Sequence, residues 1–206
     1  MTGMLLPYLQ KAVLHHDFKS LEEQAEIAEA WETAPWAVRS ILRVELLTPS
    51  VVDPCCGTGI ITDILRKSGY SVHSQDLYDW GFEGADKVGS NWLIEDMDLT
   101  GRTVMMNPPF SLACKFVDKA FALGARKVLC FQRQAWRESQ ERRMWWEKRP
   151  PARIWLCGDR ANTWLFTLPP DQRKNPRMMP CAWYVWEEGH RGIEASNTIW
   201  KKGLAA

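Results

Sequence analysis

VVDPCCGTG, residues 51–59, joins a short apolar strand to a helix. The two valines form the strand end, Asp53 stands at its carboxyl end, and Gly57 and Gly59 form a tight turn. Glycines at such a turn let the backbone approach a ligand closely, because a side chain would block the contact. The stretch therefore predicts a ligand site at the carboxyl end of a buried strand.

The residues around this turn narrow the class of ligand. A phosphate-binding P-loop would continue with Gly-Lys-Ser/Thr, and a dinucleotide fingerprint would read Gly-x-Gly-x-x-Gly; neither is present here. An acid at the strand end and a single Gly-x-Gly turn instead suit an amino acid joined to a nucleoside, which has no phosphate to hold. Taken alone, the stretch also fits a plain strand-to-helix turn.

Strand and helix patterns alternate on both sides of the turn. Apolar residues at helical spacing follow the turn and stop at Gly69, and a second helical pattern covers residues 112–123. A charged helix is expected to end near residue 148. Further strands are expected over residues 71–76, 102–106, 127–131, 153–157 and 181–186, with the last two ranges as the final strands. This alternation predicts an α/β fold with a mainly parallel sheet.

The length and composition favour a single soluble domain. The chain has 206 residues, 46% of them hydrophobic and 25% charged, and no apolar run long enough to span a membrane. The N-terminus does not resemble a secretory signal, and residues 21–31 are expected to form a helix within an extension covering 1–30. The six cysteines form no Cys-x-x-Cys, and His15-His16 lacks companion ligands, so we expect reduced thiols in an intracellular protein and no metal site.

A second acid follows at the end of the next predicted strand. Asp76 lies about twenty residues after the glycine turn, where a carboxylate can accept hydrogen bonds from both hydroxyls of a ribose. Asp79 is close enough in sequence to compete for this role. The spacing favours Asp76.

The strand over 102–106 runs directly into Asn107-Pro108-Pro109-Phe110. Two prolines stiffen the backbone and remove N–H donors, which leaves carbonyl oxygens as acceptors. The Asn107 side-chain oxygen and the Pro108 carbonyl can then accept both hydrogens of an amine, and Phe110 offers a face on which a flipped base can stack, a contact worth about 1–3 kcal/mol. A simple proline turn is the alternative for this segment alone.

In this order, the three segments resemble the class I S-adenosylmethionine-dependent methyltransferases, and specifically the small stand-alone DNA N6-adenine enzymes of phages and bacteria. The resemblance covers residues 33–191 and includes the flanking segments 33–36, 76–79, 134–151 and 182–186. It implies a Rossmann-like fold with a seven-stranded, mostly parallel sheet flanked by helices, in a single domain over residues 1–206. It also implies a cytoplasmic location in a bacterial or phage-infected cell.

The resemblance assigns roles to individual positions. Asn107, Pro108, Pro109 and Phe110 would form the catalytic loop, although Phe110 stands where many relatives have tyrosine. Asn91-Trp92 stands where such enzymes often have an acid and an aromatic residue at the cofactor's adenine, with Asp96 as the competing position. The positions implied to bind S-adenosylmethionine are Thr33, Ala34, Pro35, Asp53, Pro54, Cys55, Gly57, Gly59, Asp76, Leu77, Asn91, Trp92 and Asn107.

The choice of acceptor rests on the same resemblance. It implies methyl transfer to the N6 amine of adenine in duplex DNA, with the target adenine flipped out of the helix. Guanine-N2 methylation of ribosomal RNA and methylation of a protein glutamine remain open, because all three acceptors present a planar amide or amidine nitrogen. A cofactor-binding module that only docks a partner is a further alternative.

A DNA enzyme also needs a local basic surface, because the net charge of +1 gives no overall attraction to polyanions. Seven basic residues and three acids lie between positions 133 and 153, and the proline-rich segment 169–180 reads as a surface loop within a recognition loop over 158–180. A solvated helix face competes with DNA contact, and Trp136, Trp145 and Trp146 are expected in the core. So short a chain also suggests a homodimer or a partner subunit. The residues expected to bind substrate are Phe110, Arg133, Arg137, Arg173, Lys174 and Arg177.

Overall fold

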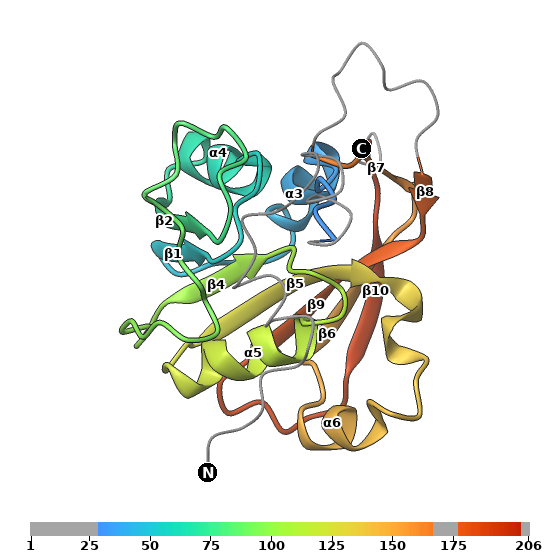
Figure 1. Cartoon of the computed structure of the whole chain (residues 1–206). Helices are drawn as coiled ribbons and strands as arrows, with labels where there is room; N and C mark the ends of the chain where they lie inside the picture. Colours follow the sequence, from blue (N-terminus) through green and yellow to red (C-terminus); the bar gives the residue numbers. More distant parts are fainter. Residues whose placement is uncertain (1–28, 167–176, 203–206) are drawn as a thin grey trace.

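The computed structural model describes residues 29–166 and 177–202. Within them, one eight-stranded sheet has helices on both faces (Figure 1). Its strand order is β10-β6-β9-β5-β4-β1-β2-β3. The strands are β1 (Ser50–Asp53), β2 (Ser71–Asp76), β3 (Lys87–Val88), β4 (Thr103–Met106), β5 (Lys127–Arg133), β6 (Arg153–Cys157), β9 (Cys181–Glu187) and β10 (Ala195–Ile199).

The remaining elements are short helices and a separate ribbon. The helices are α3 (Pro35–Ile41), α4 (Ile60–Lys67), α5 (Ala113–Ala122), the 3₁₀ turn η1 (Gln134–Arg137) and α6 (Arg143–Lys148). The two strands β7 (Ala161–Thr163) and β8 (Arg177–Met179) pair antiparallel outside the main sheet. The end of the predicted surface loop is therefore strand β8, while its residues 169–176 lie outside the described residues, as do residues 1–28 of the predicted extension and His15-His16.

The connections place a switch point between β1 and β4. Strands β2, β1, β4 and β5 are mutually parallel, so their carboxyl ends share one edge of the sheet. The chain leaves β1 toward β2 on one side and returns to β4 on the other. Ligands of open α/β sheets bind in the crevice at such a reversal. The predicted ligand turn and the predicted acceptor loop therefore meet at the same crevice.

The predicted Rossmann-like α/β fold is confirmed, but the sheet has eight strands rather than seven. The ranges 153–157 and 181–186 were expected as the last two strands, and β10 follows them, pairing parallel with β6. Both unpredicted main-sheet strands lie at edges: β10 reads Ala-Ser-Asn-Thr-Ile and β3 has two exposed residues. An edge strand open to solvent needs no continuous apolar run, so the signal that marks central parallel strands is missing.

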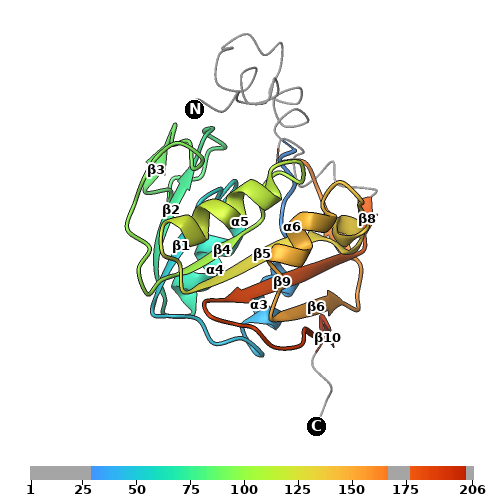
Figure 2. The ribbon, with the colours of Figure 1, turned by 90° about the horizontal axis from the view of Figure 1, so that it is seen from below.

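Side chains of the central strands alternate between two apolar cores. In β4, Val104 and Met106 belong to the core under α5 and α6, while Met105 belongs to the core under α3 and α4. Figures 1 and 2 show these helix pairs on opposite faces of the sheet. All four residues of β4 are buried, as expected of a strand covered on both faces.

An aromatic cluster fills the core under α6. Trp136 and Trp146 are buried, with ring centroids 4.8 Å apart, and Trp145, Tyr184 and Trp186 pack around them. The prediction that the three tryptophans of this segment lie in the core is thus confirmed for two, with Trp145 half-buried against it. The predicted charged helix is shorter than expected, because η1 and α6 are separated by residues 138–142.

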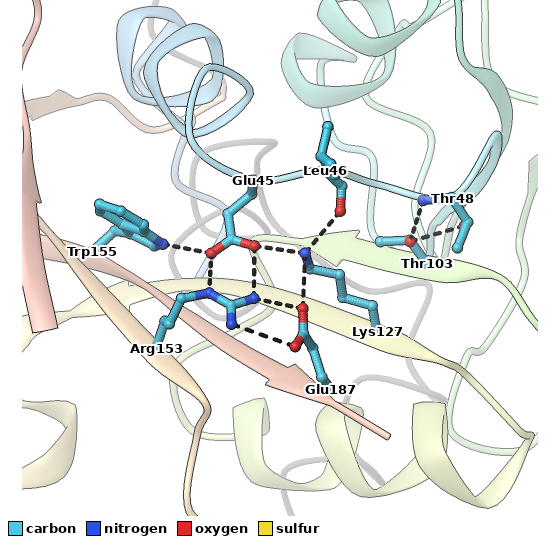
Figure 3. Close-up of polar contacts among 8 residues, drawn as sticks. All are labelled: Glu45, Leu46, Thr48, Thr103, Lys127, Arg153, Trp155 and Glu187. Carbon is cyan, nitrogen blue, oxygen red and sulfur yellow. Dashed lines mark hydrogen bonds and ion pairs between the residues drawn. The ribbon is translucent and has the colours of Figure 1, made fainter. Parts of the chain in front are cut away.

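A buried ion network joins the sheet at the edge opposite the switch point (Figure 3). Glu45 accepts hydrogen bonds from Lys127 Nζ at 2.6 Å, from Arg153 Nη2 at 2.9 Å and from Trp155 Nε1 at 2.6 Å. Burial alone would raise the pKa of Glu45, but the hydrogen bonds from Arg153, Lys127 and Trp155 lower it. Glu187 completes the network through Arg153 and Lys127, which ties β5, β6 and β9 together.

Candidate active site

A cleft opens at the carboxyl ends of β1, β2 and β4. Its walls include four segments: residues 54–55 just before the glycine turn, the end of β2, residues 90–93 and the loop after β4. Residues 29–31 and Phe166 close it from outside. The lining residues are Glu29, Ala30, Trp31, Pro54, Cys55, Asp76, Leu77, Tyr78, Trp80, Ser90, Asn91, Trp92, Leu93, Asn107, Pro109, Leu112, Phe116 and Phe166.

The glycine turn has the conformation that its sequence predicts. Gly57 and Gly59 have φ values of +54° and +85°, which L side chains rarely adopt. A Cβ on Gly57 would lie 2.2 Å from the Phe166 ring, so the bare backbone of the turn faces that ring. Phe82 covers Gly59 in the same way, because a Cβ there would lie 2.3 Å from its ring, so a ligand would reach the backbone of the turn only by displacing these two rings.

Asp53 lies beneath the turn rather than in the cleft. Its side chain is fully buried, Thr62 Oγ1 donates to Oδ2 at 2.8 Å, and Oδ1 has no partner among the described residues. Burial raises the pKa of Asp53 to about 7, and the nearby Asp76 adds to this effect. Asp53 does not line the cleft, so it would act on the cofactor only indirectly, by supporting the turn above it.

Asp76 does line the cleft, and its carboxylate organises the turns around it. Oδ2 accepts from the Gly57 N–H at 2.9 Å, and Oδ1 accepts from the Tyr78 N–H at 3.0 Å and from Trp80 Nε1 at 3.1 Å. Burial raises the pKa of Asp76, against the opposing effect of these donors. Asp79 instead accepts from the Gly81 N–H at an exposed turn. A ribose contact at Asp76 would use the remaining acceptor positions or replace the Trp80 indole.

The segment after β3 brings Asn91 and Trp92 to the other end of the cleft. Trp92 is 3% exposed and stacks near Phe116, with ring centroids 6.4 Å apart. Asn91 Oδ1 already accepts from the Leu93 N–H at 3.1 Å, so its oxygen is shared with the local turn. Asp96 is exposed and paired with Lys119, and it does not line the cleft.

The segment over 33–36 lies beside a smaller pocket next to the cleft. Thr33 lines this pocket together with Cys56 and Thr58, while Cys55 lines both pockets. Ala34 is buried in the core, and Pro35 is exposed at the first position of α3. Of the predicted cofactor positions in this segment, the structure brings only Thr33 to the glycine turn.

The loop after β4 holds Asn107 in a defined orientation. Asn107 Nδ2 donates to the main-chain oxygen of Trp31 at 2.8 Å. A carbonyl oxygen can only accept, so this contact selects the amide nitrogen and leaves Asn107 Oδ1 for another donor. On the other side of the loop, Gln132 Nε2 donates to the Pro108 oxygen at 3.1 Å. Both atoms that the sequence predicts as amine acceptors are thus fixed by neighbours.

The positively charged guanidinium of Arg133 lies over the ring of Phe110. The guanidinium carbon of Arg133 lies 4.2 Å from the ring centroid, a cation–π contact worth about 0.5–1 kcal/mol at an exposed site. Phe110 is half-buried and Arg133 is exposed. The predicted stacking residue and one predicted phosphate-binding residue are therefore in direct contact.

A strap over residues 29–32 crosses the acceptor loop, where the sequence predicted the end of a helix. Glu29 Oε2 accepts from the Ser111 N–H at 2.9 Å and from Ser111 Oγ at 2.7 Å, while the Trp31 oxygen holds Asn107. The strap is itself held by the segment 164–166, through bonds such as Phe166 N–H to the Ala30 oxygen at 3.0 Å. Sequence reasoning missed this strap because these partners are distant in the chain: Asn107 and Ser111 lie about 80 positions away, and the segment 164–166 lies still farther.

The basic residues between 133 and 153 do not form one free surface. Arg137 pairs with Glu194, Arg149 with Asp118, Arg143 with Glu147, and Arg153 with Glu45 and Glu187. The predicted phosphate contact of Arg137 thus competes with a carboxylate already in place. Arg177 lies in β8, and Arg173 and Lys174 lie outside the described residues.

No protein-family model matches the chain, and no curated protein matches it. The methyltransferase subunit of a type I restriction-modification system from Streptococcus thermophilus superposes with a TM-score of 0.54 at 13% identity, over 86% of this chain and 50% of that one. A predicted O-methyltransferase from Agrobacterium tumefaciens superposes with a TM-score of 0.52 at 14% identity, over 81% and 85%. The chain therefore has the fold of solved methyltransferases and spans half the length of the restriction-modification subunit.

No helix in ranges 29–166 and 177–202 is long and apolar enough to cross a membrane. The same ranges hold no group of three or more His, Cys, Asp or Glu side chains that could bind a metal ion.

Proposed function

We propose that the chain is an S-adenosylmethionine-dependent N-methyltransferase that acts on the N6 amine of adenine in DNA. The observation that carries the proposal is the orientation of Asn107. Its Nδ2 is engaged by the Trp31 oxygen, so Oδ1 remains as an acceptor on a residue that lines the cleft. The buried Pro108 carbonyl already accepts from Gln132 and would use its second lone pair. Two neutral acceptors on adjacent residues match the two hydrogens of an exocyclic amine.

The cleft fits the cofactor that the fold and the sequence suggest. Pro54 and Cys55, which lead into the glycine turn, would contact the methionine part, and Asp76 would accept from the ribose. Trp92, near Phe116, offers an apolar wall for the adenine ring. When bound, S-adenosylmethionine supplies an electrophilic methyl group on a sulfonium. The pocket is mostly apolar with few polar groups, as is typical of small-molecule sites.

The chain's own residues would activate the acceptor without a charged base. Asn107 Oδ1 and the Pro108 oxygen accept the two amine hydrogens, which keeps the nitrogen lone pair directed at the methyl group. The hydrogen bonds to these two oxygens become stronger as positive charge develops on the amine nitrogen, so they stabilise the transition state more than the ground state. Phe110 would stack on the flipped base, and the amine loses one proton after the methyl group is transferred.

The choice of DNA rests on the flanking sequence and on a structural likeness. The solved structure from Streptococcus thermophilus is the methyltransferase subunit of a type I restriction-modification system. Guanine-N2 in ribosomal RNA and a protein glutamine are the alternative acceptors, because each presents a planar nitrogen. A docking module without activity is the alternative from a different class, and the oriented Asn107 argues against it.

Transfer of a tritiated methyl group tests the proposal across acceptors. Purified chain is incubated with labelled S-adenosylmethionine and with adenine-containing duplex DNA, ribosomal RNA or protein in parallel. We expect label on DNA as N6-methyladenine, and its loss in Asn107→Ala with cofactor binding retained. Label on protein or RNA alone would refute the choice of DNA, and tight cofactor binding without transfer to any acceptor would support the docking module.

A further inference from the structure

The end of β5 holds the acceptor loop from two sides. Gln132, which is 1% exposed, donates to the Pro108 oxygen from within the core. The next residue, Arg133, is exposed and lies over the Phe110 ring, with its guanidinium carbon 4.2 Å from the centroid. Successive residues of a strand point to opposite sides, so one position supports the loop and the next covers its aromatic face.

Arg133 lacks the ion pair that several of its basic neighbours form. Arg137, Arg149 and Arg153 each pair with a carboxylate, whereas Arg133 forms no ion pair within ranges 29–166 and 177–202. Its guanidinium therefore brings an uncompensated positive charge to the ring on which the acceptor base would stack.

We propose that, before substrate binds, the Arg133 guanidinium occupies the face of the Phe110 ring on which the acceptor base stacks. An incoming base displaces the guanidinium from this face, and the guanidinium then binds a phosphate beside the flipped nucleotide. The inference rests on the proposed function. A guanidinium is planar, stacks on aromatic rings and pairs bidentately with phosphate, so one side chain can fill both positions. Stacking of a base on an aromatic ring is the stronger of the two contacts, so exchange favours the bound base.

The exchange defines the substrate class. A nucleic acid supplies both a flat base for Phe110 and a phosphate for the displaced Arg133. The side chain of a protein glutamine supplies neither a ring nor an anion. Arg133 would thus act as a specificity-determining residue that favours nucleic acid over protein.

The test measures the affinity for a short adenine-containing duplex at several salt concentrations, with S-adenosylhomocysteine bound. The variants are Arg133→Ala, Arg133→Lys and the control Lys67→Ala, whose exposed side chain lies at the end of α4 away from the glycine turn. Loss of one phosphate contact lowers the slope of log affinity against log salt by about 0.9. We expect this change in Arg133→Ala and no change in Lys67→Ala.

Arg133→Lys distinguishes a guanidinium that leaves the Phe110 ring when the base binds from one that stays on the ring. Lysine keeps the charge but does not stack as a planar group, so we expect the wild-type slope and an affinity at least equal to wild type. A wild-type slope in Arg133→Ala would overturn the inference. An affinity tenfold weaker in Arg133→Lys would also overturn it, because the guanidinium would then stay on the ring while the base is bound.

The wild-type chain distinguishes the two levels of failure. If it methylates DNA while Arg133→Ala keeps the wild-type slope, only this inference fails. If it neither binds nor methylates any nucleic acid, the proposed function fails as well. Thermal unfolding of each variant confirms that these exposed substitutions leave the fold intact.

Discussion

Replacing the buried carboxylate of Asp53 by an amide is expected to remove a pH dependence of stability. Burial raises the pKa of Asp53 from 3.8 to about 7, so the folded chain binds the proton more tightly than the unfolded chain does. The stability contributed by the protonated form is complete below the unfolded pKa and is lost as the pH rises toward the folded pKa. Asp53→Asn cannot ionise and loses nothing in this window.

The size of the effect follows from the shift. A difference of about 3 pKa units corresponds to about 4 kcal/mol once both states are ionised. About 2–3 kcal/mol of this is lost between about pH 5 and about pH 7.5, because over most of this range Asp53 is ionised in the unfolded chain and still protonated in the folded chain. Asp76 titrates in the same direction and interacts with Asp53, so the difference between the two proteins reports Asp53 together with its coupling to Asp76.

Urea unfolding followed by tryptophan fluorescence provides the assay. The free energy of unfolding is expected to fall by about 2–3 kcal/mol per molar urea. The urea midpoint of Asp53→Asn minus that of wild type should therefore be about 1 M larger at about pH 7.5 than at about pH 5. Thr62→Val removes the hydroxyl that donates to Asp53, so it should steepen the pH dependence rather than abolish it. A constant difference between wild type and Asp53→Asn would mean that the folded chain holds Asp53 ionised, and that the turn does not seal it from water.

Three further substitutions test the acceptor loop and the sheet. Asn107→Asp keeps an acceptor but sets a carboxylate oxygen against the Trp31 oxygen, so kcat should fall by about 10²–10³, as in Asn107→Ala; wild-type turnover would show that the strap does not orient this side chain. Gln132→Met removes the hydrogen bond to the Pro108 oxygen, which is worth about 1 kcal/mol, so kcat should fall about five- to tenfold with KM unchanged. A matching rise in KM would instead assign Gln132 to substrate binding. Lys127→Met removes one of the two cations beside the buried Glu45, which keeps Arg153 and Trp155, and should destabilise the fold by about 1.5–3 kcal/mol, measured by urea unfolding, while the folded fraction keeps its activity. The exposed pair of Lys67 gives the control, since Lys67→Met should cost less than about 1 kcal/mol.

The positions of the cleft residues could be predicted because parallel strands end at one edge. The sequence places Asp76 at the end of one predicted strand and Asn107 immediately after another, and the fold brings both to the cleft. Asp53 stands at the end of a strand as well, but it lies below the turn. The sequence shows that a residue ends a strand, but it does not show whether its side chain points into the cleft, as that of Asp76 does, or lies below the turn, as that of Asp53 does.

The basic segment was the least predictable part of the candidate site. Seven basic residues close together in sequence suggested a phosphate-binding surface, yet Arg137 pairs with Glu194, which lies 57 positions away. Arg153 likewise pairs with Glu45, 108 positions away. Local charge counts contain no information about such partners, because they depend on how the strands are ordered in the sheet.

The sequence by itself determined the alternation of strands and helices, the glycine turn at 57–59 and the order of the acid and acceptor segments. These are local properties, set by apolar periodicity and by the backbone freedom of glycine and proline. Only the tertiary structure decided which Asn107 atom remains available, that Gln132 supports the Pro108 carbonyl, and that Arg133 lies on Phe110. Each of these depends on a contact between segments distant in the chain, and such contacts exist only after the sheet has formed.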